Sequence, residues 1–120
     1  MFELKLFFLL VFGHCLADTA LQPDRMGRGK SRHNPIDMNR VPVGQKPIHL
    51  WWMQLTHHSM IHGGIVCIIT GSLLFGIIEV MGHWIIDFFK CESKYSPYGD
   101  QALHLGMKLI YILLTIGGIK

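Results

Sequence analysis

Residues 55–90 read LTHHSMIHGGIVCIITGSLLFGIIEVMGHWIIDFFK, and the way this stretch folds decides the architecture of the chain. It is apolar enough to form either one very long helix or two shorter helices that turn near residues 70–72. Glycine and serine are typical of turns, although both also occur inside membrane helices. Near its end, His83 is followed one helical turn later by Asp87, and a carboxylate in hydrocarbon is costly unless it has a partner or a task.

The composition points toward a membrane. Half of the 120 residues are hydrophobic, 16% are charged, and the mean hydropathy is +0.34, although no window holds a clean run of about 20 apolar residues. Six of the eleven lysines and arginines lie in residues 23–47. Such a cluster marks the cytoplasmic side of a membrane protein, an interpretation that we prefer over nucleic-acid binding. We therefore expect one domain, residues 1–120, in a membrane, with the arginine-rich connector in the cytoplasm and no nucleic acid as partner.

The first 20 residues, MFELKLFFLLVFGHCLADTA, can be interpreted in two ways. A lysine, a short apolar core and the small-residue ending at residues 15–17 fit a cleavable signal peptide. However, His14, Asp18 and Gln22 follow one another at intervals of four residues, which places them on one stripe of a continuing helix. A signal peptide has no need of such a stripe, so we predict a retained first helix over residues 3–22.

The rest of the chain supplies the topology. Residues 23–47 are rich in proline, glycine, arginine and asparagine and show no hydrophobic period, which predicts a polar connector. A brief turn follows Lys90, and the last helix is predicted from about Asp100 to Gly117. Positive charge at both connectors places them on one side of the membrane, which a helix hairpin over residues 54–90 allows and one long helix does not. The predicted fold is all-α, an integral membrane bundle of four short helices.

Each predicted helix carries one pair of polar side chains spaced four residues apart. The pairs lie at the ends of the first and third helices and at the starts of the second and fourth, so the hairpin topology brings them to one level. They are His14 and Asp18, His58 and His62, His83 and Asp87, and Asp100 and His104. The remaining histidines, His33, His49 and His57, fall outside the pattern. We therefore predict a polar His/Asp centre near the cytoplasmic face.

Facing side chains in bundle cores are typical of metal sites. Imidazole and carboxylate ligands suit zinc and also iron or manganese. Eight candidate ligands exceed what one tetrahedral ion needs, which predicts one or two divalent ions, with Zn²⁺ as the first choice. The simpler interpretation of any single pair is local structure; Asp100, for example, could cap the last helix. Four pairs at one level favour the metal centre.

Three further residues are candidate catalytic groups. Glu79 lies one turn deeper than the pair on the third helix and could orient a ligand, act as a general base or pair with a neighbouring helix. Gln101 could orient a ligand or bind substrate. Lys90, Arg25 and Lys30 could each bind a phosphate, although solvated surface charge is the simpler interpretation of all three. Lys90 could also be an anchor at the membrane interface.

With these residues in place, the sequence resembles a family of small bacterial and phage membrane proteins catalogued as domain of unknown function 3307. The shared motifs are H-x-x-x-D followed by L-Q, then H-G, then H-x-x-x-D-x-x-K, and last D-Q-x-x-H. In this chain they are His14, Asp18, Leu21 and Gln22; His62 and Gly63; His83, Asp87 and Lys90; and Asp100, Gln101 and His104. The resemblance covers most of the chain except residues 31–53. It implies the helical membrane architecture and a location in the bacterial inner membrane, but no reaction, because the activity of the family is not established.

More loosely, the pattern is similar to that of membrane-bound metal-dependent hydrolases. That similarity implies hydrolysis of a phosphoester or a lipid-like substrate at the cytoplasmic face, within the lipid bilayer. Two alternatives stay open. A haem-binding anchor of a redox complex would use two histidines as axial ligands but would give the paired aspartates no role. A non-enzymatic membrane protein would act through an unidentified protein partner and use the polar centre as a structural network.

Overall fold

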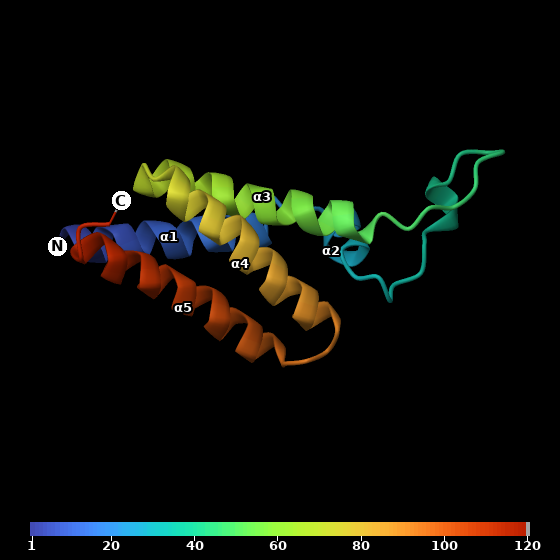
Figure 1. Ribbon diagram of the computed structural model, residues 1–120. Helices are drawn as coiled ribbons and strands as arrows, with labels where there is room; N and C mark the ends of the chain where they lie inside the picture. The colour runs from blue at the N-terminus through green and yellow to red at the C-terminus, as the bar shows by residue number, and fades with distance from the viewer. Residues whose placement is uncertain (120) are drawn as a thin grey trace.

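The computed structural model describes residues 1–119, and all of its regular elements are helices (Figure 1). In chain order they are α1 (Phe2–Asp18), α2 (Asp24–Gly29), the 3-10 helix η1 (Met38–Arg40), α3 (Trp51–Thr70), α4 (Leu73–Cys91) and α5 (Pro97–Ile116). The predicted all-α class is confirmed. The short α2 and η1 lie in the connector, for which the sequence predicted no regular structure.

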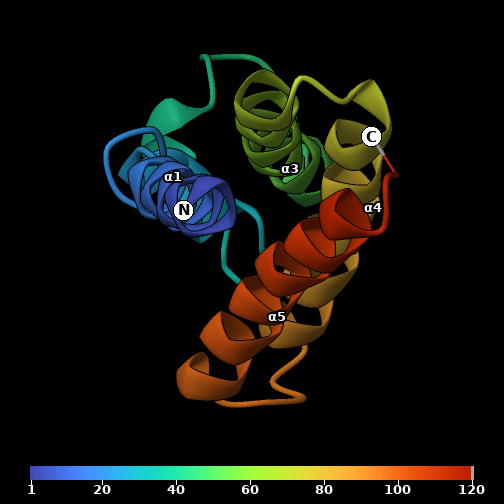
Figure 2. The same ribbon diagram turned by 90° about the vertical axis from the view of Figure 1, so that its left-hand side faces the viewer.

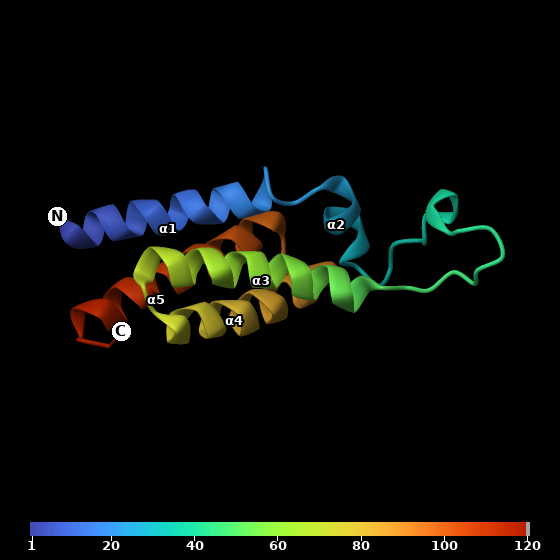
Figure 3. The same cartoon turned by 90° about the horizontal axis from the view of Figure 1, so that it is seen from above.

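The four long helices form an antiparallel ring. Each contacts two neighbours, in the order α1, α3, α4, α5 and back to α1, and α2 packs on α3 (Figure 2). The connector projects beyond the end of the bundle that lies opposite both termini (Figures 1 and 3). This arrangement places the last turns of α1 and α4 at the same end as the first turns of α3 and α5.

The turn between α3 and α4 falls at its predicted position. Gly71 follows α3 with a φ of 69°, a left-handed conformation that glycine adopts without steric cost, and the Ser72 hydroxyl accepts a hydrogen bond from the Phe75 N–H at 3.3 Å. The two helices then pack very closely. A Cβ on Gly63 would lie 2.6 Å from the carbonyl oxygen of Gly76. The hairpin prediction is confirmed, and the single long helix is excluded.

Two helix boundaries differ from the predicted ones. The first helix, α1, ends at Asp18, a full turn before its predicted end. The last helix, α5, begins at Pro97 rather than near Asp100. Ser96 caps it by accepting a hydrogen bond from the Gly99 N–H at 3.2 Å, and proline suits the first helical position because its missing N–H would have had no partner there. Asp100 is therefore not the cap, and its carboxylate is available inside the bundle.

The interior of the bundle is divided into two parts. Buried apolar residues fill the half nearer the termini: Leu6, Leu10, Val66, Phe75, Tyr111 and Ile112. The half nearer the connector holds buried histidines and carboxylates instead. A polar layer thus replaces the apolar core at the end of the bundle where the predicted ligands lie.

The prediction of an integral membrane bundle is wrong. Within residues 1–119, no helix has both the length and the apolarity needed to cross a membrane. The physical reason is that polar residues recur almost every turn along the inner faces of α3, α4 and α5, while α1 has only 17 residues. The predicted multi-pass location in the bacterial inner membrane, with a cytoplasmic connector, is contradicted by the same finding. The high mean hydropathy instead reflects outward-facing side chains such as Phe8, Phe12 and Leu113, all of which are exposed.

Candidate metal centre

The four polar pairs meet at one level of the bundle. The imidazole rings of His62 on α3 and His83 on α4 stack with their centroids 3.6 Å apart. On one continuous helix these residues would lie about 30 Å from each other. The rings of His14 on α1 and His104 on α5 lie 5.1 Å apart in the same cluster. The convergence predicted from topology is therefore confirmed.

A first group of candidate ligands comprises Asp18, His58, His62 and His83, each of which offers one atom within 4.8 Å of the others. The Oδ1 atom of Asp18 lies 3.0 Å from Nε2 of His62 and 3.3 Å from Nε2 of His58. Three imidazoles and one carboxylate match the number and type of ligands in tetrahedral zinc sites.

A second group comprises Asp87, Asp100 and His104. The Oδ1 atoms of Asp87 and Asp100 lie 3.2 and 3.4 Å from Nε2 of His104. Three protein ligands match the catalytic type of zinc site, which keeps a further position for water. Asp87 also connects the two groups, because its other oxygen, Oδ2, lies 3.6 Å from Nε2 of His58.

His14 belongs to neither group alone. It can share an ion with His83 and His104, and its Nε2 atom lies 3.4 Å from Oδ2 of Asp18. The same nitrogen is 3.0 Å from Oε1 of Gln101. His14 therefore lies between the two groups, where it could bind either ion.

Several polar atoms of the centre are buried without a hydrogen-bond partner among the described residues. They include both ring nitrogens of His58 and of His83, and Oδ1 of Asp100. Both histidines are fully buried. Most buried polar atoms in folded proteins are hydrogen-bonded, so a cluster of exceptions requires an explanation. Coordination to metal ions would satisfy one nitrogen of each imidazole and the carboxylate oxygen, and the donor set therefore fits divalent ions.

The carboxylates of the centre favour their ionised form. Burial opposes ionisation of Asp18, but the close Nε2 atoms of His58 and His62 outweigh it and hold the pKa of this group well below its usual range. For Asp87, burial is outweighed by the hydrogen bond from His104 and the charge of Lys30, so its pKa is also lowered. Carboxylates bind metals in the ionised form, and both groups have that form at neutral pH.

Two central histidines favour their neutral form. Burial lowers the pKa of His62 to about 4 and that of His83 to about 3, although the nearby carboxylates of Asp18 and Glu79 partly oppose this effect. Neutral imidazole is the form that binds metals. His104 differs, because its carboxylate neighbours outweigh burial and raise its pKa. A metal at His104 would therefore displace a proton more often than a metal at His62.

A buried network lies beneath the centre. The Lys108 ammonium donates a hydrogen bond to Oε1 of Glu79, and the Tyr111 hydroxyl donates one to Oε2 at 2.9 Å. Oε1 of Glu79 also lies 3.5 Å from Nδ1 of His83. The predicted pairing of Glu79 with a neighbouring helix is confirmed, because Lys108 and Tyr111 lie on α5. Of the other two predicted roles, this geometry favours orienting the imidazole, because a carboxylate at Nδ1 directs Nε2 toward a metal.

Lys108 and Tyr111 were not predicted as parts of the site. The signal was nevertheless present in the sequence, since they follow His104 at intervals of four and then three residues and therefore share its helical face. A lysine in this position was easily attributed to the surface, but Lys108 is only 1% exposed.

The centre reaches solvent beside Asp18, Lys90 and Gln101. The side chains of Asp18 and Lys90 are 25% and 34% exposed. The Lys90 ammonium lies 2.8 Å from Oδ2 of Asp100, and the Gln101 amide donates to Asp18 and Asp100 at 3.4 and 3.3 Å. Lys90 and Gln101 thus lie at the mouth of the site, its solvent-exposed edge. Both residues were predicted as candidate substrate-binding groups.

The connector also contributes a residue to the centre. Lys30, the residue after α2, places its ammonium 2.5 Å from Oδ2 of Asp87 and 2.9 Å from Oε1 of Gln22. It is only 7% exposed, so solvated surface charge is the wrong interpretation for this lysine. Arg25, on the outer side of α2, is exposed and does not contact the centre.

The histidines left out of the predicted ligand set do lie outside the centre. His57 is exposed, His33 pairs with Glu92 at 2.9 Å, and His49 contacts the carbonyl oxygen of Asn34 at 2.8 Å. The four-residue spacing therefore separated the histidines inside the buried cluster from those outside it, even for the adjacent pair His57 and His58.

Comparisons of the chain with protein families, with curated proteins and with solved structures find no match. The resemblance to the family catalogued as domain of unknown function 3307 therefore stays a prediction. Inferences about function rest on the geometry of the centre.

Proposed function

We propose that this protein is a metal-dependent hydrolase that holds two divalent ions, Zn²⁺ in the first instance, in its His/Asp centre and cleaves a phosphoester. One observation carries the proposal: eight side chains from four helices converge on one buried centre, in which ring nitrogens of His58 and His83 have no hydrogen-bond partner within residues 1–119. A purely structural network would be expected to satisfy such atoms.

In this proposal, each of the two ligand groups binds one ion. The group around Asp18 supplies four ligands, the group around His104 supplies three, and Asp87 connects them with one oxygen toward each group. Bound divalent ions lower the pKa of a water ligand and neutralise charge on a phosphoryl oxygen. Glu79 acts as a positioning residue that holds the orientation of the His83 ring.

Two residues at the mouth are proposed to bind the phosphate group. Burial alone would lower the pKa of Lys90, but its ion pair with Asp100 outweighs burial and raises that pKa, so the side chain stays an ammonium. The Gln101 amide adds a hydrogen-bond donor at the same exposed edge. The lipid-like substrate and the bilayer as a partner were predicted from a membrane location, and they lose their support with it.

The test compares two adjacent histidines. Full-length protein loaded with Zn²⁺ or Mn²⁺ is assayed with bis-p-nitrophenyl phosphate and p-nitrophenyl phosphate, a diester and a monoester. The change His58→Ala removes a buried ligand and should lower kcat at least about 100-fold. The control His57→Ala alters an exposed side chain and should leave kcat unchanged.

Chelation should abolish the activity, and added metal should restore it in the wild type and the control only. Hydrolysis that survives both chelation and His58→Ala would refute the proposed function. Folded, metal-loaded wild type without activity on either ester would refute phosphoester hydrolysis.

The haem alternative is less well supported by the packing. The rings of His62 and His83 stack at 3.6 Å and those of His83 and His104 at 4.1 Å, which suits individual ions better than a flat macrocycle between two axial ligands. A Soret band in the purified protein would reverse this preference.

A further inference from the structure

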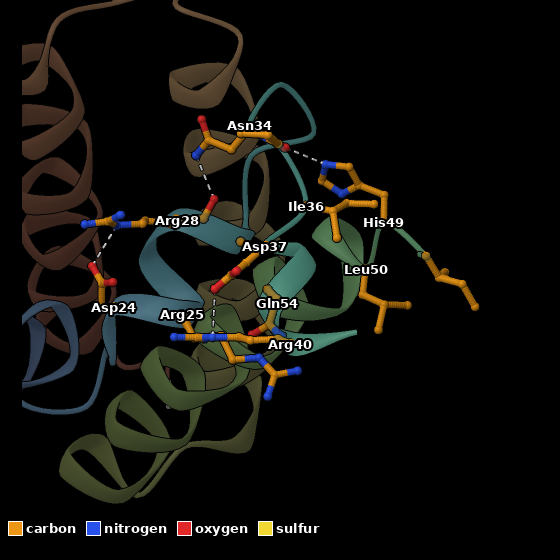
Figure 4. Close-up of a pocket in the computed structure, with 13 residues that line it drawn as sticks. Asp24, Arg25, Arg28, Asn34, Ile36, Asp37, Arg40, His49, Leu50 and Gln54 are labelled. Carbon is orange, nitrogen blue, oxygen red and sulfur yellow. Dashed lines mark hydrogen bonds and ion pairs between the residues drawn. The ribbon is translucent and has the colours of Figure 1, made fainter. Parts of the chain in front are cut away.

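A cavity of about 570 Å³ lies on the outer side of α2 and is separate from the candidate metal ligands (Figure 4). It is lined by α2, the connector up to Leu50, and the first turn of α3, which contributes Gln54. Its volume falls in the range of small-molecule sites, which is about 300–1,000 Å³.

The cavity has an excess of positive charge. Arg25, Arg28 and Arg40 line it together with Asp24 and Asp37, so its formal charge is three minus two, or +1. Arg28 pairs with Asp24 at 3.0 Å and Arg40 with Asp37 at 3.1 Å, but all four side chains are at least half exposed, and such surface pairs are weak. Arg25 has no ion-pair partner within residues 1–119.

The rest of the lining is apolar or neutral. Pro35, Ile36, Ile48 and Leu50 form apolar walls, and His49 lies beside Ile36 and Leu50 (Figure 4). Guanidinium groups bind phosphate in bidentate fashion, whereas apolar walls favour a carbon-containing group. The lining therefore suits an organic phosphate better than a bare phosphate ion.

The cavity is a close neighbour of the metal centre. Gly29 lines it, and the next residue, Lys30, contacts Asp87 of the centre. Gln54 also lines it and precedes His58 by one turn of α3, a rise of about 6 Å. The two sites thus share α2 and one stripe of α3.

We propose that this cavity binds an organic phosphate monoester of the size of a nucleoside monophosphate, with Arg25 and Arg40 holding the phosphate. That the bound group is part of the hydrolase substrate rests on the proposed function. Binding itself does not, because the cavity contains none of the eight candidate metal ligands.

The test is calorimetric titration of chelator-treated full-length protein with adenosine 5′-monophosphate. Adenosine, which lacks the phosphate, should bind at least about tenfold more weakly. The double change Arg25→Gln/Arg40→Gln should weaken nucleotide binding by about tenfold or more for the same reason. The control Lys46→Gln/Lys94→Gln removes the same charge from exposed residues outside the cavity and should change affinity by less than about threefold.

A third variant separates the two sites. His58→Ala should retain nucleotide binding even if it abolishes hydrolysis. Binding that depends on His58 or on added metal would place the ligand in the metal centre and overturn this inference while leaving the proposed function intact. Equal losses in the cavity variant and the charge control would reduce the effect to long-range attraction and also overturn it. The absence of any heat of binding up to about 10 mM nucleotide would likewise overturn this inference.

Discussion

At the scale of single residues, burial opposes the charged form of the ionisable groups in the centre. Neighbouring side chains restore the charged form of some groups but not of others. Asp18 and Asp87 keep their charge because histidines and a lysine surround them, whereas His62 and His83 remain neutral because burial dominates. Metal ligands need both of these protonation states. These four donors therefore have the protonation states in which such groups would bind a metal ion.

This balance predicts how the metal-free protein responds to acid. The folded-state pKa of His62, about 4, lies below the ordinary value of 6.5, so the unfolded chain binds more protons between these pH values. Stability from this group is present above pH 6.5 and is lost as pH falls toward 4, by on the order of 1–3 kcal/mol once the opposite effect of His104 is included. Urea unfolding of chelator-treated protein at pH 7 and pH 5 measures the loss. A free energy of unfolding that is equal or higher at pH 5 would contradict it.

The buried pair of Glu79 and Lys108 makes a second prediction at this scale. Lys108→Met should destabilise the protein by about 3–5 kcal/mol, because it leaves a buried carboxylate without its cation. The double change Glu79→Gln/Lys108→Met should be less damaging than Lys108→Met alone, since no charge remains to be compensated. Chemical unfolding of the three proteins gives the answer. A double variant that is less stable than Lys108→Met would argue against a charge-compensating role for Lys108.

At the scale of helices, the position of the site depends on the hairpin of α3 and α4. The close crossing at Gly63 and Gly76 brings His62 and His83 into contact across the two helices. Gly63→Ala would place a methyl group against Val80 and 2.6 Å from the Gly76 carbonyl oxygen, forcing the helices apart. We expect a loss of about 1–3 kcal/mol in stability and weaker metal binding.

The neighbouring glycine provides a matched control for that change. A Cβ on Gly64 would meet no atom within 4 Å, so Gly64→Ala should be neutral or stabilising by about 0.5–1 kcal/mol through helix propensity. Thermal unfolding and zinc titration of the two variants side by side measure both effects. Equal behaviour of the two variants would mean that the close crossing does not position the site.

Much of this element-level picture could be predicted from the sequence. The turn at residues 70–72 and the convergence of the eight candidate ligands followed from glycine chemistry, positive charge and four-residue spacing. The additional turn at the start of α5 could not be anticipated from Asp100, because Ser96 and Pro97 provide the cap and the first position. Lys30 could not be placed either, since its contact with Asp87 depends on how α2 packs on α3.

At the scale of the whole molecule, the main wrong prediction was the membrane around the bundle, whereas the predicted arrangement of its helices was confirmed. Charge placement indicated correctly that the polar pairs share one end of the bundle, and the membrane interpretation of the same charges was wrong. The hydropathy of the chain comes from the apolar core and from outward-facing residues such as Phe8, so composition alone did not distinguish a spanning helix from a polar-centred bundle. Inward-facing polar residues at each turn were the feature that distinguished them.

The central claim is that imidazoles and carboxylates from four helices hold two ions together. Zinc K-edge X-ray absorption on the zinc-loaded full-length protein tests it most directly. We predict nitrogen and oxygen ligands at about 2.0–2.1 Å with imidazole features, and a zinc–zinc vector at about 3.5–4 Å that is lost in Asp87→Asn. Sulfur ligands at about 2.3 Å, or folded protein that retains no zinc, would contradict the claim.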